Sequence, residues 1–273
     1  MSDPRDALDA VGQLPDVEID LAGAAIQFAR IDAPDADWHA AAEHLSELAR
    51  DSVALDVTST DVAARVGALA GLIAGRHRYS GDTETYDDLA NANLIHVIGR
   101  RRGLPVALGV LWLHAARAAG WHAHGVDFPG HFLLALSGGG RQAVLDVFAG
   151  GTPLDVRELR GLIKRVGGEG AELRPDQLRP MGARAVLLRL QYNIVQRRLN
   201  ANDLEGALAG TEDMLLFAPD QAAQWRDAGL MNRRLDRVSA ALRCFERFLA
   251  LVPVGEAAER VRGVMEELRS RLN

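Results

Sequence analysis

A histidine and an aspartate on two neighbouring predicted strands could form part of a catalytic site. His131 follows the Pro-Gly pair of the segment FPGHFLLAL, and Asp146 lies in a second apolar run, AVLDVF. In many hydrolases and acyl transferases an acidic side chain orients a histidine, which activates a nucleophile. A cysteine nucleophile is best placed at a helix N-terminus, where the helix dipole lowers the pKa of its thiol. The question is whether this chain has such a residue.

The segment that should carry the nucleophile contains none. A strongly apolar helix is predicted over residues 105–119, and its start reads GLPVAL, without Cys, Ser or Thr. Cys244, the one cysteine, lies in ALRCFERFLAL near the other end of the chain, where we interpret it as a small buried apolar residue. A His–Asp pair without a nucleophile can orient a proton carrier, but it cannot form a thioester.

Three short segments with strand character must hold the pair. They span residues 122–128, 131–136 and 141–148, and turn residues separate them: Pro129 and Gly130, then 137–140. A buried helix followed by an antiparallel meander predicts an α+β fold. Mostly helical sequence surrounds this core. Helices are expected at 21–31, 35–50, 58–76, 89–100 and 157–166. Ser59, Thr60 and Asp61 are N-cap candidates for the third of these helices. A loop is expected at 77–88 and a linker at 175–180.

The C-terminal part of the chain repeats itself. Pro219 and Pro253 are 34 residues apart, as are the pairs Ala207–Leu208 and Ala241–Leu242, and each proline ends an apolar helix. This period and pattern are typical of tetratricopeptide repeats. We expect about two repeats and a closing helix at 256–272. The predicted domains are therefore a core at 1–178 and an all-α, tetratricopeptide-like region at 179–273.

Three motifs together resemble the SirB-type bacterial proteins, which have a degenerate transglutaminase-like (papain-like) core and a tetratricopeptide tail. The motifs are RRRGLP, FPGHF and LDVFAGG, and the resemblance is densest over residues 86–151. It implies that His131 and Asp146 occupy the family's His and Asp positions and that Pro105 stands at or beside the nucleophile position. Asn91 matches an Asn of the SirB-type pattern. Val147 and Asn93 depart from that pattern, where a Pro and an aromatic residue are usual.

Two functions are consistent with these residues. The first is a non-catalytic transglutaminase-like protein that acts as a protein-interaction or regulatory scaffold, with His131 and Asp146 as a structural or ligand-orienting pair. The alternative is a hydrolase or amidase-type enzyme in which this pair, with Asn91, activates a bound water without a cysteine. A third reading is a peptide-binding adaptor that uses an open concave face over residues 183–272.

Several other residues are candidates for binding. Arg101 and Arg102 belong to an arginine run before a predicted helix, where they could hold an anion or pair with nearby acids; Tyr86 is a further candidate. His122 and His124 share a strand face, so a metal site is conceivable, but no carboxylate or cysteine completes a set. We therefore expect no metal and no cofactor.

Composition limits the classes of partner and the compartment. The net charge of −6 at pH 7 argues against nucleic-acid binding, and one cysteine cannot form an internal disulfide. The N-terminus lacks a signal-peptide pattern, and no stretch approaches the roughly 20 apolar residues of a membrane span. We expect a cytoplasmic protein with a protein or peptide partner and no nucleic-acid or membrane ligand, and the sequence leaves its oligomeric state open.

Overall fold

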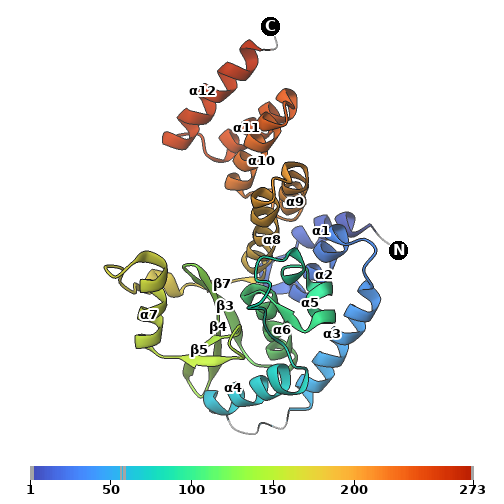
Figure 1. The fold of residues 1–273 in the computed structure, drawn as a ribbon, viewed down its shortest axis with the longest axis vertical. Helices are drawn as coiled ribbons and strands as arrows, with labels where there is room; N and C mark the ends of the chain where they lie inside the picture. Colours follow the sequence, from blue (N-terminus) through green and yellow to red (C-terminus); the bar gives the residue numbers. More distant parts are fainter. Residues whose placement is uncertain (1–2, 56, 58–59, 272–273) are drawn as a thin grey trace. The chain divides into compact units, whose positions relative to one another are not determined.

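The computed structural model describes residues 3–55, 57 and 60–271. Contacts divide the chain into two compact units: one is Pro15–Leu190, and the other combines the residues up to Leu14 with those from Gln191 onward. Figure 1 traces the chain through both. The boundary at 178/179 stays a prediction. The predicted α+β class, mostly helical with a small antiparallel sheet, is confirmed.

Helices form the first half of the unit Pro15–Leu190. Asp37 caps α3 by accepting a hydrogen bond from the backbone N–H of Ala40. Ser59, an N-cap candidate for the helix expected at 58–76, lies outside the described residues. The single helix predicted at 89–100 is wrong, because Asn93 interrupts it: its side chain accepts from the N–H groups of Ile95 and His96 and starts a new helix. The helical elements are α2 (Leu21–Asp32), α3 (Trp38–Val53), α4 (Val62–Ala70), a π-helical turn (Gly71–Arg76), a 3-10 turn (Leu89–Asn91) and α5 (Leu94–Arg100).

The predicted meander forms the centre of a five-stranded antiparallel sheet, and its turns follow from the glycines. Gly130 has φ +68°, which fits the third position of a Pro-Gly type II turn, and Gly139 and Gly140 both have positive φ, as a type I′ hairpin requires. The strand order is β6-β5-β4-β3-β7. The strands are β3 (Ala123–Phe128), β4 (His131–Gly138), β5 (Arg141–Asp146), β6 (Thr152–Leu154) and β7 (Pro180–Met181).

The two edge strands, β6 and β7, were missed by the sequence analysis. The linker expected at 175–180 is wrong: Pro175–Leu178 is a 3-10 turn, and β7 then pairs with β3 through Val126 and Pro180. Strands of two or three residues are too short to show the alternation of apolar and polar residues that predicts a strand. They form because the outer backbone groups of β3 and β5 need hydrogen-bond partners.

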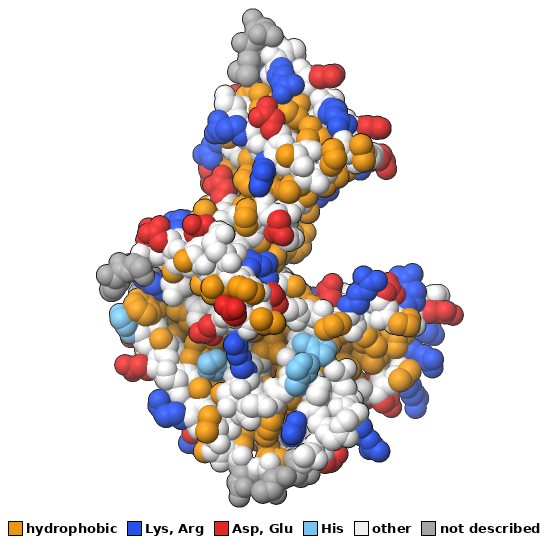
Figure 2. Space-filling view, turned by 180° about the vertical axis from the view of Figure 1, so that it is seen from behind, with side chains coloured by type: hydrophobic (Ala, Val, Ile, Leu, Met, Phe, Trp, Pro, Cys, Tyr) orange, Lys and Arg blue, Asp and Glu red, His pale blue; other side chains and the backbone are white. Residues whose placement is uncertain are grey.

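Two helices pack on the sheet. Helix α6 (Pro105–Ala118) lies so close to β4 that a Cβ atom at Gly109 would come within 2.1 Å of the Phe132 ring. Leu159 and Ile163 of α7 (Val156–Gly167) pack with strand residues such as Leu133 in a separate apolar cluster. The outer side of α7 is basic, with Arg157, Arg160, Lys164 and Arg165 exposed, and these cations gather at the right of Figure 2.

The second unit consists of helical hairpins, as the repeat period predicts. Within it, a Cβ at Gly229 would lie 2.4 Å from the Phe245 ring, so a glycine is needed where α10 crosses α11. Helix α1 (Pro4–Gly12), which the sequence analysis did not predict, packs on α9, and Arg5 pairs with Asp213 at 2.7 Å. The other helices are α9 (Leu204–Phe217), α10 (Ala222–Arg234), α11 (Val238–Leu251) and α12 (Glu256–Ser270), preceded by the part of α8 (Ala183–Asn200) from Gln191 onward.

No helix among the described residues has both the length and the apolar character that a membrane span requires.

Candidate functional site

His131 and Asp146 lie together in the structure. His131 is the first residue of β4 and Asp146 the last of β5, and His131 Nε2 lies 3.1 Å from Asp146 Oδ1. Both side chains are mostly buried. Although the distance is short, Nε2 has no well-aligned hydrogen-bond acceptor among the described residues, so the contact between the two side chains has poor hydrogen-bond geometry. The other ring nitrogen, Nδ1, remains for a further partner.

Asp146 also fixes the backbone that follows it. Its Oδ1 accepts hydrogen bonds from the N–H groups of Phe148 (3.0 Å) and Ala149 (3.3 Å). Burial raises the pKa of Asp146, but His131 and the two backbone donors together lower it more, so the net pKa is below its ordinary value. Asp146 is therefore held as a carboxylate that both orients a histidine and forms a tight turn.

Replacing His131 by alanine is expected to reverse the direction of the Asp146 shift. Burial would remain while the largest lowering contact is lost, so the pKa of Asp146 should rise, which carboxyl-detected NMR titration can measure. In the wild type the pKa is lowered on folding. The carboxylate therefore stabilises the fold above the ordinary pKa of about 3.9, and this contribution is lost as pH falls through the folded value. His124→Ala, on the next strand, should leave Asp146 unchanged; an equal effect of both variants would contradict the direct contact.

Pro105, the predicted nucleophile position, is the first residue of α6 and is buried. It has no N–H, and the cap residue before it, Leu104, makes no side-chain capping hydrogen bond. The N–H of Leu104 donates to the main-chain oxygen of Asn91 at 2.9 Å. The start of α6 is thus fixed by backbone contacts and presents no nucleophilic group.

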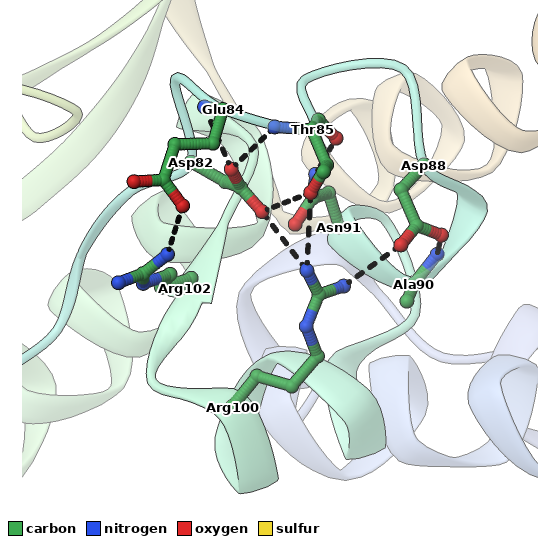
Figure 3. Close-up of polar contacts among 8 residues, drawn as sticks. All are labelled: Asp82, Glu84, Thr85, Asp88, Ala90, Asn91, Arg100 and Arg102. Carbon is green, nitrogen blue, oxygen red and sulfur yellow. Dashed lines mark hydrogen bonds and ion pairs between the residues drawn. The ribbon is translucent and has the colours of Figure 1, made fainter.

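Asp82 organises the loop beside the start of α6, as Figure 3 shows. Its carboxylate accepts hydrogen bonds from the N–H groups of Glu84 and Thr85, from the Thr85 hydroxyl at 2.7 Å and from Arg100 at 2.9 Å. The backbone N–H and the hydroxyl of Thr85 are the main causes that lower the pKa of Asp82 to about 2, and the N–H of Glu84 adds to them. The side chain is 1% exposed, so this is a buried and permanently charged hub.

The backbone around Asp82 connects three parts of the candidate site. The N–H of Asp82 donates to the Gly103 oxygen (3.3 Å), and the N–H of Gly81 donates to the Phe148 oxygen (3.2 Å). Gly103 lies just before α6, and Phe148 lies in the turn that Asp146 caps. The loop therefore sets the helix start relative to the aspartate. Sequence analysis missed Asp82, although an aspartate three residues before a threonine in a polar loop is a common turn signal.

Asn91 is a structural member of the same network. It is fully buried, and its Nδ2 donates to the Thr85 main-chain oxygen at 2.6 Å. Its Oδ1 is buried without a hydrogen-bond donor among the described residues. An amide that is fully buried and already used by the loop cannot reach a substrate directly.

The predicted binding residues have partners within the unit Pro15–Leu190. Arg102 pairs with Glu84 at 2.9 Å, while Arg100 pairs with Asp82 and Asp88. Tyr86 lies edge-to-face against Phe148, with ring centroids 5.9 Å apart. Tyr86 and the loop therefore cover the turn next to Asp146. A ligand role for Arg101, Arg102 and Tyr86 stays a prediction.

Arg101 enters a second polar cluster that sequence analysis did not foresee. Its Nη1 lies 2.5 Å from both His44 Nε2 and the Tyr79 hydroxyl. Burial, and then Arg101, lower the pKa of His44, so its ring is neutral near pH 7. Burial raises the pKa of Tyr79 to about 12 despite the nearby arginine.

The neighbouring side chains of His44, Glu47 and His77 could in principle hold a metal, because one ligand atom from each lies within 4.8 Å of the others. The hydrogen bonds argue against it. Arg101 can only donate, so His44 Nε2 accepts and His44 Nδ1 carries the proton toward Glu47 at 3.0 Å. His77 Nε2 is paired with Asp51 at 2.8 Å. Neither nitrogen of His44 therefore offers a lone pair, and we interpret the cluster as a structural network. The His44-x-x-Glu47 spacing in the helix predicted at 35–50 could have indicated this cluster from the sequence.

The remaining candidates lie elsewhere. His122 and His124 are neighbours with ring centroids 5.8 Å apart, and burial, followed by His122, lowers the pKa of His124. They belong to no metal-ligand group among the described residues. Cys244 lies in α11 of the other unit, and burial is the main cause of its raised thiol pKa. A thiol that resists ionisation is a poor nucleophile.

Comparison with known proteins agrees with this arrangement of a helix, a small sheet and helical repeats. A family model described as transglutaminase-like superfamily matches residues 37–192, and a tetratricopeptide-repeat model matches residues 194–266. The chain therefore belongs to the transglutaminase-like superfamily. The resemblance to SirB-type proteins with C-terminal tetratricopeptide repeats is confirmed by these matches and by the bacterial relatives.

The UPF0162 protein of Xylella fastidiosa (strain Temecula1) is 35% identical over 193 residues, which cover 70% of this chain and 69% of that protein. The UPF0162 protein of Vibrio cholerae is 28% identical over 215 residues, which cover 79% of this chain and 80% of that protein. Among solved structures, a crystal structure of menin matches with a TM-score of 0.44 and 9% sequence identity. The match covers 90% of this chain and 70% of the menin chain.

Proposed function

We propose that this chain is a non-catalytic transglutaminase-like protein that acts as a protein-interaction scaffold in the cytoplasm. The observation that supports this most directly is Pro105 at the start of α6, where the family resemblance puts the nucleophile. Proline has no thiol, hydroxyl or N–H, so it supplies neither a nucleophile nor an oxyanion-hole donor. Acyl transfer through a thioester is then impossible at this position.

The retained contact between His131 and Asp146 has a structural explanation within this proposal. Asp146 caps the turn after β5, and that turn contacts the Asp82 loop through Phe148. A buried carboxylate of this kind needs polar partners, which the N–H groups of Phe148 and Ala149 and the adjacent His131 ring provide. The pair can therefore persist for stability after the loss of catalysis.

The alternative is hydrolysis or amide cleavage by a water molecule that His131 activates. It is favoured by one observation: the contact with Asp146 uses Nε2 and leaves Nδ1 for a water. The proposed helper Asn91 counts against it, because its amide is fully buried and bound to the loop.

Activity-directed probes separate the two functions. Cys244→Ser protein, which contains no thiol, should be incubated with hydroxyl-directed acylating probes and with acyl-donor peptides, and mass spectrometry should read covalent labelling and peptide cleavage. The scaffold proposal predicts neither. Labelling or turnover that disappears in His131→Ala would refute the scaffold proposal and establish the enzyme.

A further inference from the structure

Helix α7 carries a row of positive charges on the side that faces solvent. Arg157, Arg160 and Lys164, which we call the basic stripe, are spaced i, i+3 and i+7 and therefore share one side of the helix over roughly 10 Å of its axis. The opposite side is fixed against the sheet by Leu159 and Ile163, which are 4% and 3% exposed. The basic stripe therefore has to face outward, and the cations of α7 lie at the right of Figure 2.

The chain itself compensates little of this charge. Lys164 pairs with Glu169 at 3.2 Å. The side chains of Arg157, Arg160 and the neighbouring Arg165 have no ion pair or hydrogen bond with any described residue, although acidic residues outnumber basic ones in the chain by 37 to 31. These arginines can therefore bind an anion from outside the chain.

The basic stripe also destabilises its own helix. Like charges three or four residues apart repel one another, which applies to Arg157 with Arg160 and to Arg160 with Lys164. Arg157 lies in the first turn, where the helix dipole disfavours a cation and favours an acid such as Glu158. All three cations are exposed, so packing does not require them. An anionic partner that lies across the basic stripe removes the repulsion, and binding therefore explains this charge pattern where folding does not.

The surroundings of the basic stripe indicate which class of anion fits. Residues 155–179 hold six cations and five carboxylates, so their net charge is +1. A flat membrane surface meets the flanking acids as well as the cations, and one net charge raises its affinity by only about fivefold. The segment has no aromatic side chain on which a nucleotide base could stack. A narrow acidic peptide segment can follow the cations alone, and Val156 and Val166, both 56% exposed, offer it apolar contacts at the two ends of α7.

We propose that the basic stripe binds an acidic segment of a partner protein in which Asp or Glu recurs at every second residue of an extended chain. Such carboxylates are spaced by about 6.7 Å, close to the roughly 5–6 Å between neighbouring side chains of the basic stripe. The guanidinium groups of Arg157 and Arg160 each donate hydrogen bonds to one carboxylate, and Lys164 exchanges Glu169 for a third. This inference rests on the scaffold function and names the surface and the chemistry of its partner.

Selection of a display library of short random peptides on the full chain tests the proposal, and fluorescence anisotropy gives the affinity of an enriched peptide. We expect Asp and Glu at alternate positions. Arg157→Glu combined with Arg160→Glu should weaken that peptide by about tenfold or more, because the attraction becomes a repulsion. Arg243→Glu combined with Arg247→Glu is the matched control, since it makes the same charge change on two exposed arginines of α11, and it should leave the affinity unchanged.

The α7 variants are expected to fold, because glutamate near a helix N-terminus is favourable. Arg157→Gln combined with Arg160→Gln is the milder pair if the first misfolds. The proposal is overturned if no peptides are enriched, if enriched peptides lack acidic residues, or if the α7 and α11 double variants weaken binding equally.

Two further probes cover the other anions. Binding of duplex DNA, or of vesicles of phosphatidylcholine and phosphatidylserine, that needs Arg157 and Arg160 while no acidic peptide is enriched also overturns the proposal. The outcome is separate from that of the activity probes: His131-dependent labelling would refute the scaffold function, whereas loss of peptide binding in the α7 variants depends only on the basic stripe.

Discussion

Replacing Asp82 by alanine is expected to lower the free energy of unfolding by about 3–4 kcal/mol. The carboxylate is buried and accepts hydrogen bonds from Glu84, Thr85 and Arg100. Removing it leaves two backbone N–H groups and the Thr85 hydroxyl without their acceptor, while Arg100 keeps its ion pair with Asp88. Each buried donor left unpaired costs about 1–3 kcal/mol. Urea denaturation followed by circular dichroism measures the loss.

The pH dependence of this effect has a definite sign. The folded pKa of Asp82 is about 2, below the unfolded value of about 3.9. Its stabilisation is therefore fully present above roughly pH 4 and is lost as pH falls through about 2. Asp82→Asn should differ most from the wild type above this window and least below it. Glu84→Gln is the control, since Glu84 pairs with Arg102 at the surface and an exposed pair contributes about 0–1 kcal/mol. Equal losses in both variants would contradict the role of Asp82 as the hub.

Replacing Pro105 by cysteine, in a Cys244→Ser background, is expected to create an acidic thiol. The substitution puts a sulfur at the N-terminal end of α6, where the helix dipole favours the thiolate. If Pro105 occupies the lost nucleophile position, His131 adds a second stabilising charge. We expect a thiol pKa about two units or more below the ordinary 8.5, measured from the ultraviolet absorbance of the thiolate during a pH titration.

Two controls decide the cause of that shift. His131→Ala in the same background should raise the thiol pKa, because the partner cation is removed. Ala118→Cys, at the C-terminal end of the same helix, should titrate at or above the ordinary value, since the dipole there opposes a negative charge. If the thiol at position 105 has an ordinary pKa that does not change in His131→Ala, the helix start and the His–Asp pair do not form one site.

Asp82 and Pro105 determine two separate properties of one region. Asp82 connects the backbone before α6 with the turn after Asp146 through hydrogen bonds at Gly103 and Phe148. In the proposed function, Pro105 stands where the nucleophile of the family would be. The hydrogen bonds of the Asp82 loop do not involve the Pro105 side chain, so this geometry does not depend on a reactive group there.

Elements with a long period or strong turn residues could be predicted from the sequence. Helix 105–118 has a proline at its first position and continuous apolar residues, and the hairpins have glycines where positive φ is needed. The repeats follow from Pro219 and Pro253, 34 residues apart. Local chemistry determines each of these features. The absence of a nucleophile near Pro105 is also a property of the sequence alone.

Tertiary structure alone decided the contacts between distant segments. β7 exists because β3 has an open edge, and α1 joins the C-terminal helices because α9 offers an apolar surface. The same holds for Asp82, which meets Arg100 only after the loop folds back, and for Arg101, whose partner His44 is 57 residues away. Residue types and spacing specify which groups can pair. Which groups do pair depends on packing and burial, since a charge removed from water must bind the partners that the fold brings to it.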